Sequence, residues 1–177
     1  MPFATVRTID HSSLAVAEEV HSIQMVAYAQ EARLIGARYF PPLDRTAQDI
    51  RSADAVFLGA FLGGELGGAL GIENTEGPGV LNIESLVVSP GQQRQGIGFS
   101  LLSAALELYA EKDMEVSTST KNDPALRLYA KFGFVEYHRR RVGPEAIEIV
   151  SLRKVRSNHS VERPSFGKPQ SAAHLKR

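Results

Sequence analysis

The chain has 177 residues, of which 43% are hydrophobic and 23% are charged, so it can close one core of ordinary size. Twenty basic side chains balance twenty acidic ones, and this zero net charge argues against an extended nucleic-acid footprint or a polybasic membrane anchor. The absence of cysteine excludes disulfides, thiolate metal sites and cysteine nucleophiles.

The first half of the chain predicts a strand, two helices and three further strands. We place the ends of these elements from the apolar alternation, from the Ser, Pro and Gly positions and from the glycine pair at 63–64. In order, we expect a strand over 3–9, a helix that Ser12 or Ser13 caps and that runs towards Gly36, a helix over 44–51, a hairpin of strands 55–62 and 66–72, and a strand over 80–88.

The second half alternates helices with strands. Apolar residues recur at helical spacing from Ile97 to Leu108, and a β-branched run follows at 116–120. Asp123 is expected to cap another helix, with Pro124 at its first position and Gly133 just past its end. Two segments, 134–142 and 146–155, predict a terminal antiparallel hairpin. This order indicates an α/β domain with a central mixed sheet.

The composition changes near residue 155. Residues 156–177 hold five basic residues and one acidic residue, and they are rich in Ser, Pro and Gly without an apolar period. Such a segment buries too little apolar surface to offset its ordering entropy. We therefore expect one domain over residues 1–155 and a basic, disordered tail over residues 156–177.

The N-terminal residues and the hydropathy pattern bear on location. The segment MPFATVRTID lacks the basic-then-apolar layout of a signal peptide, and no apolar run approaches about 18 residues. We therefore expect a soluble, cytoplasmic protein with neither a membrane nor a nucleic acid as partner.

A glycine-rich loop at 91–98 joins the strand 80–88 to the helix that follows. At such a turn, backbone N–H groups converge on an anion and the helix dipole reinforces them, which predicts a phosphate site. Ile97 and Gly98 replace the Lys and Ser/Thr that a nucleoside triphosphatase needs, and Leu101 stands where the dinucleotide fingerprint requires glycine. The loop therefore indicates another class of phosphate ligand.

Two motifs together resemble the GNAT superfamily of N-acetyltransferases. The QxxGxG pattern at 93–98, after LNIESLVVSP at 81–90, resembles the pyrophosphate loop of that superfamily. The NxxAxxxY pattern at 122–129, followed by Gly-Phe at 133–134, is similar to its second signature. The resemblance covers about residues 1–155, and it implies an α/β fold whose mixed, mostly antiparallel sheet is flanked by helices.

The resemblance also implies acetyl-coenzyme A as cosubstrate. In the family, the strand at 80–88 diverges from the next parallel strand near 114–120, and the pantetheine arm fills the gap like an extra strand. By analogy, the N–H of Leu86 polarises the thioester carbonyl. The implied cofactor-binding residues are Leu86, Val87, Val88, Gln93, Arg94, Gln95, Gly96, Ile97, Gly98, Phe99, Ser100, Asn122 and Tyr129.

Acetyl transfer to an alkylamine needs a base, because such an amine has a pKa near that of lysine, about 10.4. Glu84 is two residues before Leu86, which predicts the same strand face, and family members that act on alkylamines have a glutamate at the matching place. A solvated or structurally paired carboxylate is the other interpretation. Asn82, Glu73 and Glu115 are further polar candidates near the expected cleft.

Tyr129 is implied as the acid that protonates the departing thiolate, and a core aromatic is the alternative interpretation. Asn122 matches the family asparagine that hydrogen-bonds the cofactor arm, and helix capping is its alternative role. The five histidines have no metal-ligand spacing, so we expect no metal. The run HRRR at 138–141 indicates a solvated edge strand, with contact to an acidic substrate or to the adenosine 3′-phosphate as the functional alternative.

We therefore expect an acetyl-CoA-dependent N-acyltransferase that moves the acetyl group directly to a primary amine of a small molecule or peptide, without an acyl-cysteine intermediate. Acceptor specificity is expected in segment 13–52, in loop 73–79 and in the final hairpin. Three alternatives stay open: a longer acyl group, a non-catalytic acyl-CoA-binding or regulatory module, and a protein N-acetyltransferase. A homodimer is a possible assembly.

Overall fold

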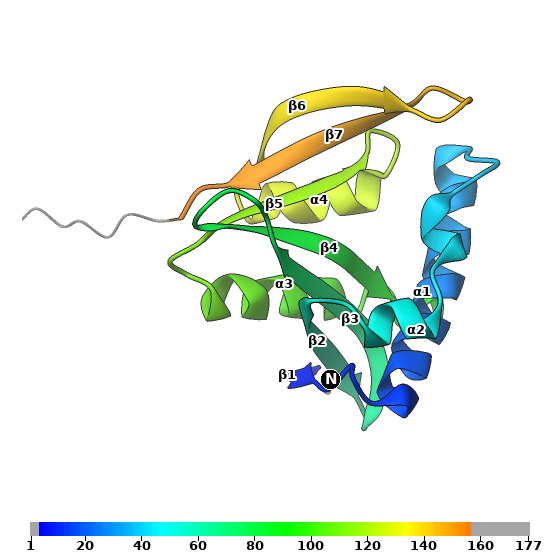
Figure 1. Ribbon diagram of the computed structural model, residues 1–177, viewed down its shortest axis with the longest axis vertical. Coiled ribbons are helices and arrows are strands. Elements are labelled where there is room, and N and C mark those ends of the chain that lie inside the picture. Colours follow the sequence, from blue (N-terminus) through cyan, green and yellow to red (C-terminus); the bar gives the residue numbers. More distant parts are fainter. Residues whose placement is uncertain (1–3, 157–177) are drawn as a thin grey trace, which may run out of the picture.

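A sheet of seven strands forms the centre of the protein, for which the computed structural model describes residues 4–156. In chain order the strands are β1 (Thr5–Ile9), β2 (Ala55–Leu62), β3 (Glu65–Asn74), β4 (Val80–Val88), β5 (Asp113–Ser119), β6 (Val135–Val142) and β7 (Ile147–Lys154). Their spatial order is β1-β2-β3-β4-β5-β7-β6 (Figure 1). Only β4 and β5 run parallel, which confirms an α/β fold with a mixed, mostly antiparallel sheet.

The helices lie on both faces of this sheet. They are α1 (Leu14–Ile35), α2 (Ala47–Arg51), α3 (Ile97–Leu108) and α4 (Asp123–Lys131), with two short 3₁₀ turns, η1 (Pro41–Asp44) and η2 (Pro90–Gln92). The core of α1 and α2 packs against β2, β3 and β4 on one face. A larger core joins α3 and α4 to the other face. The segment predicted as a tail lies outside the described residues beyond Arg156.

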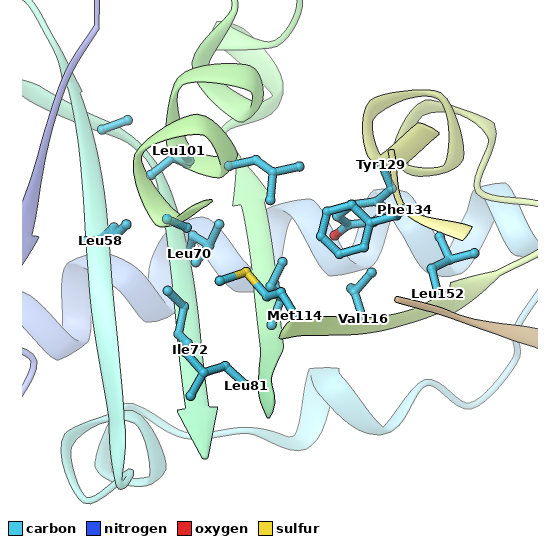
Figure 2. Packing of buried hydrophobic residues seen from close by; sticks show 14 of the residues in the cluster. Leu58, Leu70, Ile72, Leu81, Leu101, Met114, Val116, Tyr129, Phe134 and Leu152 are labelled. Carbon is cyan, nitrogen blue, oxygen red and sulfur yellow. The ribbon is translucent and has the colours of Figure 1, made fainter. Parts of the chain in front are cut away.

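The larger core runs along the sheet beneath α3 and α4. Figure 2 shows Leu70 of β3 beside Met114 of β5, with Tyr129 and Phe134 packed together further along. The two aromatic rings are 5.4 Å apart between centroids and tilted by 57°. The predicted helical stripe of Ala125, Leu128, Tyr129 and Phe132 packs into this core, as expected.

Two helix starts differ from the sequence expectation. Ser13 is the N-cap of α1, as expected, although its side chain makes no capping bond. The shorter helix begins at Ala47 rather than at residue 44, because Thr46 and Asp49 form a capping box after the 3₁₀ turn. Asn122, and not Asp123, caps α4, since its side-chain oxygen accepts from the N–H of Ala125 at 3.3 Å.

Candidate active site

Strands β4 and β5 pair only over their first three residues. The parallel ladder joins Val80–Asn82 to Asp113–Glu115, and beyond it the two strands separate, as Figure 1 shows. A cavity of about 300 Å³ lies in this opening and is lined by both strands, at residues 83–86 and 116–119. The predicted divergence near 114–120 is therefore confirmed, and it leaves two strand edges open to a ligand.

The edge of β4 offers backbone groups to this opening. The N–H of Ser89 donates to the carbonyl of Gly67 on β3 at 2.8 Å. Because N–H directions alternate along a strand, the N–H groups of Leu86 and Val88 point to the other side, towards β5. The strand thus presents two free donors at the place where the sequence predicted a cofactor arm.

The loop before α3 is open to solvent and rich in backbone donors. Arg94 and Gly96 have positive φ angles of 61° and 79°, and a Cβ on Gly96 would meet nothing within 4 Å. Within the described part of the chain, no N–H from Arg94 to Phe99 donates to a backbone carbonyl. Gln93 ties the loop to α1, because its Nε2 donates to Oε1 of Gln30 at 2.7 Å. This geometry suits an anion at the positive end of the α3 dipole.

A β-bulge at Glu84 changes the orientation of β4. Ser85 pairs with Gly71 and Ile83 with Ile72, so Glu84 is an extra residue with no partner on β3. Ile83 and Leu86 both pack in the core under α3 and α4. In a regular strand, residues three positions apart would face opposite sides of the sheet. The bulge has reversed the alternation between them.

The bulge overturns one expectation about the site. Glu84 and Leu86 do not share a strand face: Glu84 turns towards α1 and η1, whereas Leu86 turns towards α3 and α4. Both still line the cavity. The carboxylate therefore enters the cavity from the side opposite the Leu86 side chain.

Glu84 is held by three neighbours. Arg45 Nη1 donates to Glu84 Oε2 at 2.7 Å, and the two side chains are only 18% and 14% exposed. The hydroxyl of Ser85 donates to Oε1 at 3.1 Å. Gly71 provides the space for this carboxylate, because a Cβ at position 71 would collide with it. The predicted alternative, a structurally paired carboxylate, thus describes how Glu84 lies.

Tyr129 lies at the wall of the cavity formed by α4. Its side chain is 4% exposed, and its hydroxyl makes no hydrogen bond to any described residue. Burial, together with the nearby Glu31 and Tyr28, raises the pKa of Tyr129 well above its ordinary value. The hydroxyl is therefore protonated at neutral pH and free to donate a hydrogen bond into the cavity.

A second carboxyl reaches the cavity from α1. Asn122 Nδ2 donates to Glu31 Oε1 at 3.1 Å, and burial raises the pKa of Glu31 above its ordinary value. The Asn122 side chain thus serves both the cap of α4 and this carboxyl. Of the two predicted roles of Asn122, capping is confirmed, and contact with a cofactor arm stays a prediction.

Two polar cavity residues were missed by the sequence reasoning, Tyr28 and Glu31, and so was Arg45, which binds Glu84. The polar spacing of Gln24, Tyr28 and Glu31 on α1 could have indicated one side facing a cavity, because buried polar residues interrupt its apolar stripe. Nothing in the spacing of Arg45 indicated its contact with Glu84.

The other polar candidates lie away from the cavity. Asn82 Nδ2 donates to Glu73 Oε1 at 2.7 Å on the neighbouring strand. Glu115 is bonded to Arg153 and accepts from the Tyr137 hydroxyl at 2.7 Å. None of these three candidates lines the cavity.

Residues 4–156 hold neither a metal centre nor a membrane-spanning helix. No group of three or more His, Cys, Asp or Glu is placed to hold a metal ion. No helix there has the length and apolar character that crossing a membrane requires.

Comparisons with known proteins agree with this geometry. The family model described as "Acetyltransferase (GNAT) family" matches residues 17–134. The UPF0157 protein YqkA of Bacillus subtilis (strain 168) is 32% identical over 127 residues, which are 71% of this chain and 36% of that protein. The chain therefore spans little more than a third of the length of this curated relative.

Solved structures share the fold at low sequence identity. The ribosomal-protein-S18-alanine N-acetyltransferase from Escherichia coli has a TM-score of 0.67 and 16% identity, covering 85% of this chain and 92% of that one. The PaiA N-acetyltransferase from Thermoplasma acidophilum, in complex with coenzyme A, has a TM-score of 0.64 and 16% identity, covering 84% and 97%. With the family model matching more than half of its residues, this chain belongs to the GNAT family of acetyltransferases.

Proposed function

We propose that this protein transfers the acetyl group of acetyl-CoA directly to a primary amine of a small molecule or peptide. The observation that carries the proposal is the opening between β4 and β5. Backbone donors on the edge of β4 and the Tyr129 hydroxyl both face this opening. A cytoplasmic location, expected from the sequence, belongs to the same proposal.

The described residues fit acetyl-CoA. The N–H groups from Arg94 to Phe99 suit its pyrophosphate, and the open edge of β4 at Leu86 to Val88 suits the amides of its pantetheine arm. When bound, acetyl-CoA supplies an activated acetyl thioester.

In this proposal the N–H of Leu86 donates to the thioester oxygen as negative charge develops on it. One such donor is worth about 3 to 4 kcal/mol of barrier. Tyr129 donates a hydrogen bond, and then its proton, to the departing sulfur. The raised pKa of Tyr129 keeps the phenol a hydrogen-bond donor across neutral pH, but it makes full transfer of the proton to the sulfur less favourable, so a proton given up by Tyr129 is regained from solvent.

The proton of the attacking ammonium needs an acceptor in the cavity. Glu84 keeps this role in the proposal, directly or through water. Its contacts with Arg45 and Ser85 leave other lone pairs of its carboxylate free, since two oxygens accept about four hydrogen bonds. Glu31 is the second carboxyl at the cavity, and its raised pKa would make it a stronger base once ionised.

The test is thiol release from acetyl-CoA, followed with a colorimetric thiol reagent across polyamines, amino acids, aminoglycosides and lysine peptides. The protein has no cysteine, so it adds no background. Release that depends on one acceptor class would support the proposal and name the class. Tight binding of acetyl-CoA by calorimetry without release from any acceptor would instead favour a non-catalytic acyl-CoA-binding module.

A further inference from the structure

We propose that Arg140 binds a carboxylate of the acceptor, so that the preferred substrate carries both a primary amine and a carboxylate, as amino acids do. This inference rests on the proposed acetyl transfer and names the acceptor class for the same cavity. Three observations carry it: the position of Arg140 on β6, the lack of a carboxylate partner for its guanidinium, and the acidic and aromatic groups that share the cavity.

The run HRRR on β6 divides between the two faces of the sheet. Arg140 pairs with Ile149 of β7, and both residues line the cavity. Arg139 points to the other face, where it contacts Glu136 at 2.8 Å and Glu148 at 3.0 Å. Arg140 is the one arginine of this run that lines the cavity, and its side chain is exposed, so it lies at the solvent edge of the cavity.

The Arg140 guanidinium has no carboxylate within ion-pair distance among residues 4–156. Its Nη1 donates to the hydroxyl of Ser151 at 3.5 Å, and that hydroxyl is 2.9 Å from the hydroxyl of Ser117. Hydroxyls orient the guanidinium but leave its charge unbalanced. Arg45, which contacts the cavity residue Glu84, differs because that carboxylate already neutralises it. An incoming carboxylate would therefore find its partner at Arg140.

The amine end of such a substrate has a place elsewhere on the cavity wall. Glu31 supplies a carboxyl there, bonded to Asn122. Tyr28 and Phe40 line the same cavity and meet edge to face, with ring centroids 5.9 Å apart. A carboxyl beside aromatic rings suits an ammonium group. The cavity thus has separate positions for the two charges of a zwitterion.

The size of the cavity agrees with a small acceptor. Its volume of about 300 Å³ is at the low end for ligand pockets, and part of that space borders the opening that the cosubstrate would fill. A free amino acid, or the end of a short peptide, is the kind of molecule that the remaining space suits. The shared chemistry is a carboxylate a short distance from a primary amine.

The experiment compares acceptors that differ only in the carboxylate. Thiol release is measured with several amino acids, with their amides, with the decarboxylated amines, and with short peptides that carry an acidic residue. The variant is Arg140→Gln. Arg141→Gln is the matched control, because it removes the same charge from the next residue of β6. Arg141 lies opposite Glu148 in the strand register and does not line the cavity.

For the unaltered protein, we expect kcat/KM to favour the carboxylated acceptor over its amide. Arg140→Gln should raise KM for the carboxylated acceptor about tenfold, because the exposed ion pair is partly screened, and should leave the amide within about twofold. The KM for acetyl-CoA should stay unchanged. Arg141→Gln should keep the preference.

Several outcomes would overturn this inference. The amides could be the better acceptors of the unaltered protein, or Arg140→Gln could weaken both acceptor types equally. A higher KM for acetyl-CoA alone would assign Arg140 to a phosphate of the cosubstrate. In each case acetyl transfer itself would still be observed. Release from no acceptor would contradict the proposed function and the inference with it.

Discussion

Replacing Tyr129 by Phe isolates the contribution of one hydroxyl. The ring is 4% exposed and packs on Phe134, so the variant keeps the buried aromatic contact. The hydroxyl makes no hydrogen bond to a described residue, and its removal leaves no partner in the protein unsatisfied. We therefore expect the free energy of unfolding to change by less than about 1 kcal/mol.

The effect on catalysis should be much larger than the effect on stability. An acid placed at the leaving group contributes about a hundredfold or more, and a thiolate leaves without help more readily than an alkoxide, so we expect kcat to fall about 100-fold. This loss corresponds to about 2.7 kcal/mol of transition-state stabilisation. The KM for acetyl-CoA should change little, because the proposed phosphate contacts lie on the loop before α3.

The assay is initial-rate thiol release from Tyr129→Phe and the unaltered protein, with thermal unfolding measured on both. Burial raises the pKa of Tyr129 above the ordinary tyrosine value of about 10. Tyr129 should therefore stay protonated up to at least about pH 10, and any fall in rate between about pH 8 and 10 should come from another group. An equal kcat in the variant would refute the role of Tyr129 as acid and leave it a core aromatic.

Three further predictions concern the phosphate loop and the two carboxyl groups. Gly96→Asp should weaken acetyl-CoA binding in calorimetry at least tenfold relative to Gly96→Asn, since both side chains tolerate the positive φ but only one adds charge; equal affinities would place the phosphates elsewhere. Burial raises the pKa of Glu31, so just above the ordinary glutamate pKa the folded state binds more protons than the unfolded state. The free energy of unfolding should therefore fall as pH rises through that window. Glu31→Gln should remove this fall in denaturant titrations, and a fall that persists in the variant would belong to another group. Gly71→Ala should cost about 1 to 3 kcal/mol and displace Glu84, whereas Gly91→Ala, whose Cβ meets nothing, should be neutral in the same unfolding assay; similar stabilities would show that the carboxylate can move freely.

The order of helices and strands could be predicted because it depends on local patterns. The apolar period from Ile97 to Leu108 and the Gly-Pro break before β7 are visible in the sequence, and the structure has both elements there. Helix starts were less certain. Asn122 and Asp123 are both good caps, and only the backbone geometry decides between them.

The candidate site was predictable only in part. The loop at 93–98 and the pattern at 122–129 indicated its two ends, since both are motifs of contiguous residues. Glu31 and Arg140 come from distant segments, and only the packing of α1 and β6 around the opening brings them to one cavity. Arg45 comes from a third segment and reaches the cavity residue Glu84. No periodicity in one segment can indicate such a meeting.

The bulge at Glu84 explains why strand alternation failed at the most informative position of the chain. A period of two predicts that Glu84 and Leu86 share a face, and an extra residue in β4 reverses this. The sequence carries a trace of it in Gly71, which leaves room for the displaced carboxylate. The reversal lets one short stretch of strand turn Glu84, the proposed base, towards α1, while the side chain of Leu86 turns towards α3 and α4. A regular strand would place both side chains on one side of the sheet, and the cavity would then receive Glu84 from the same side as Leu86.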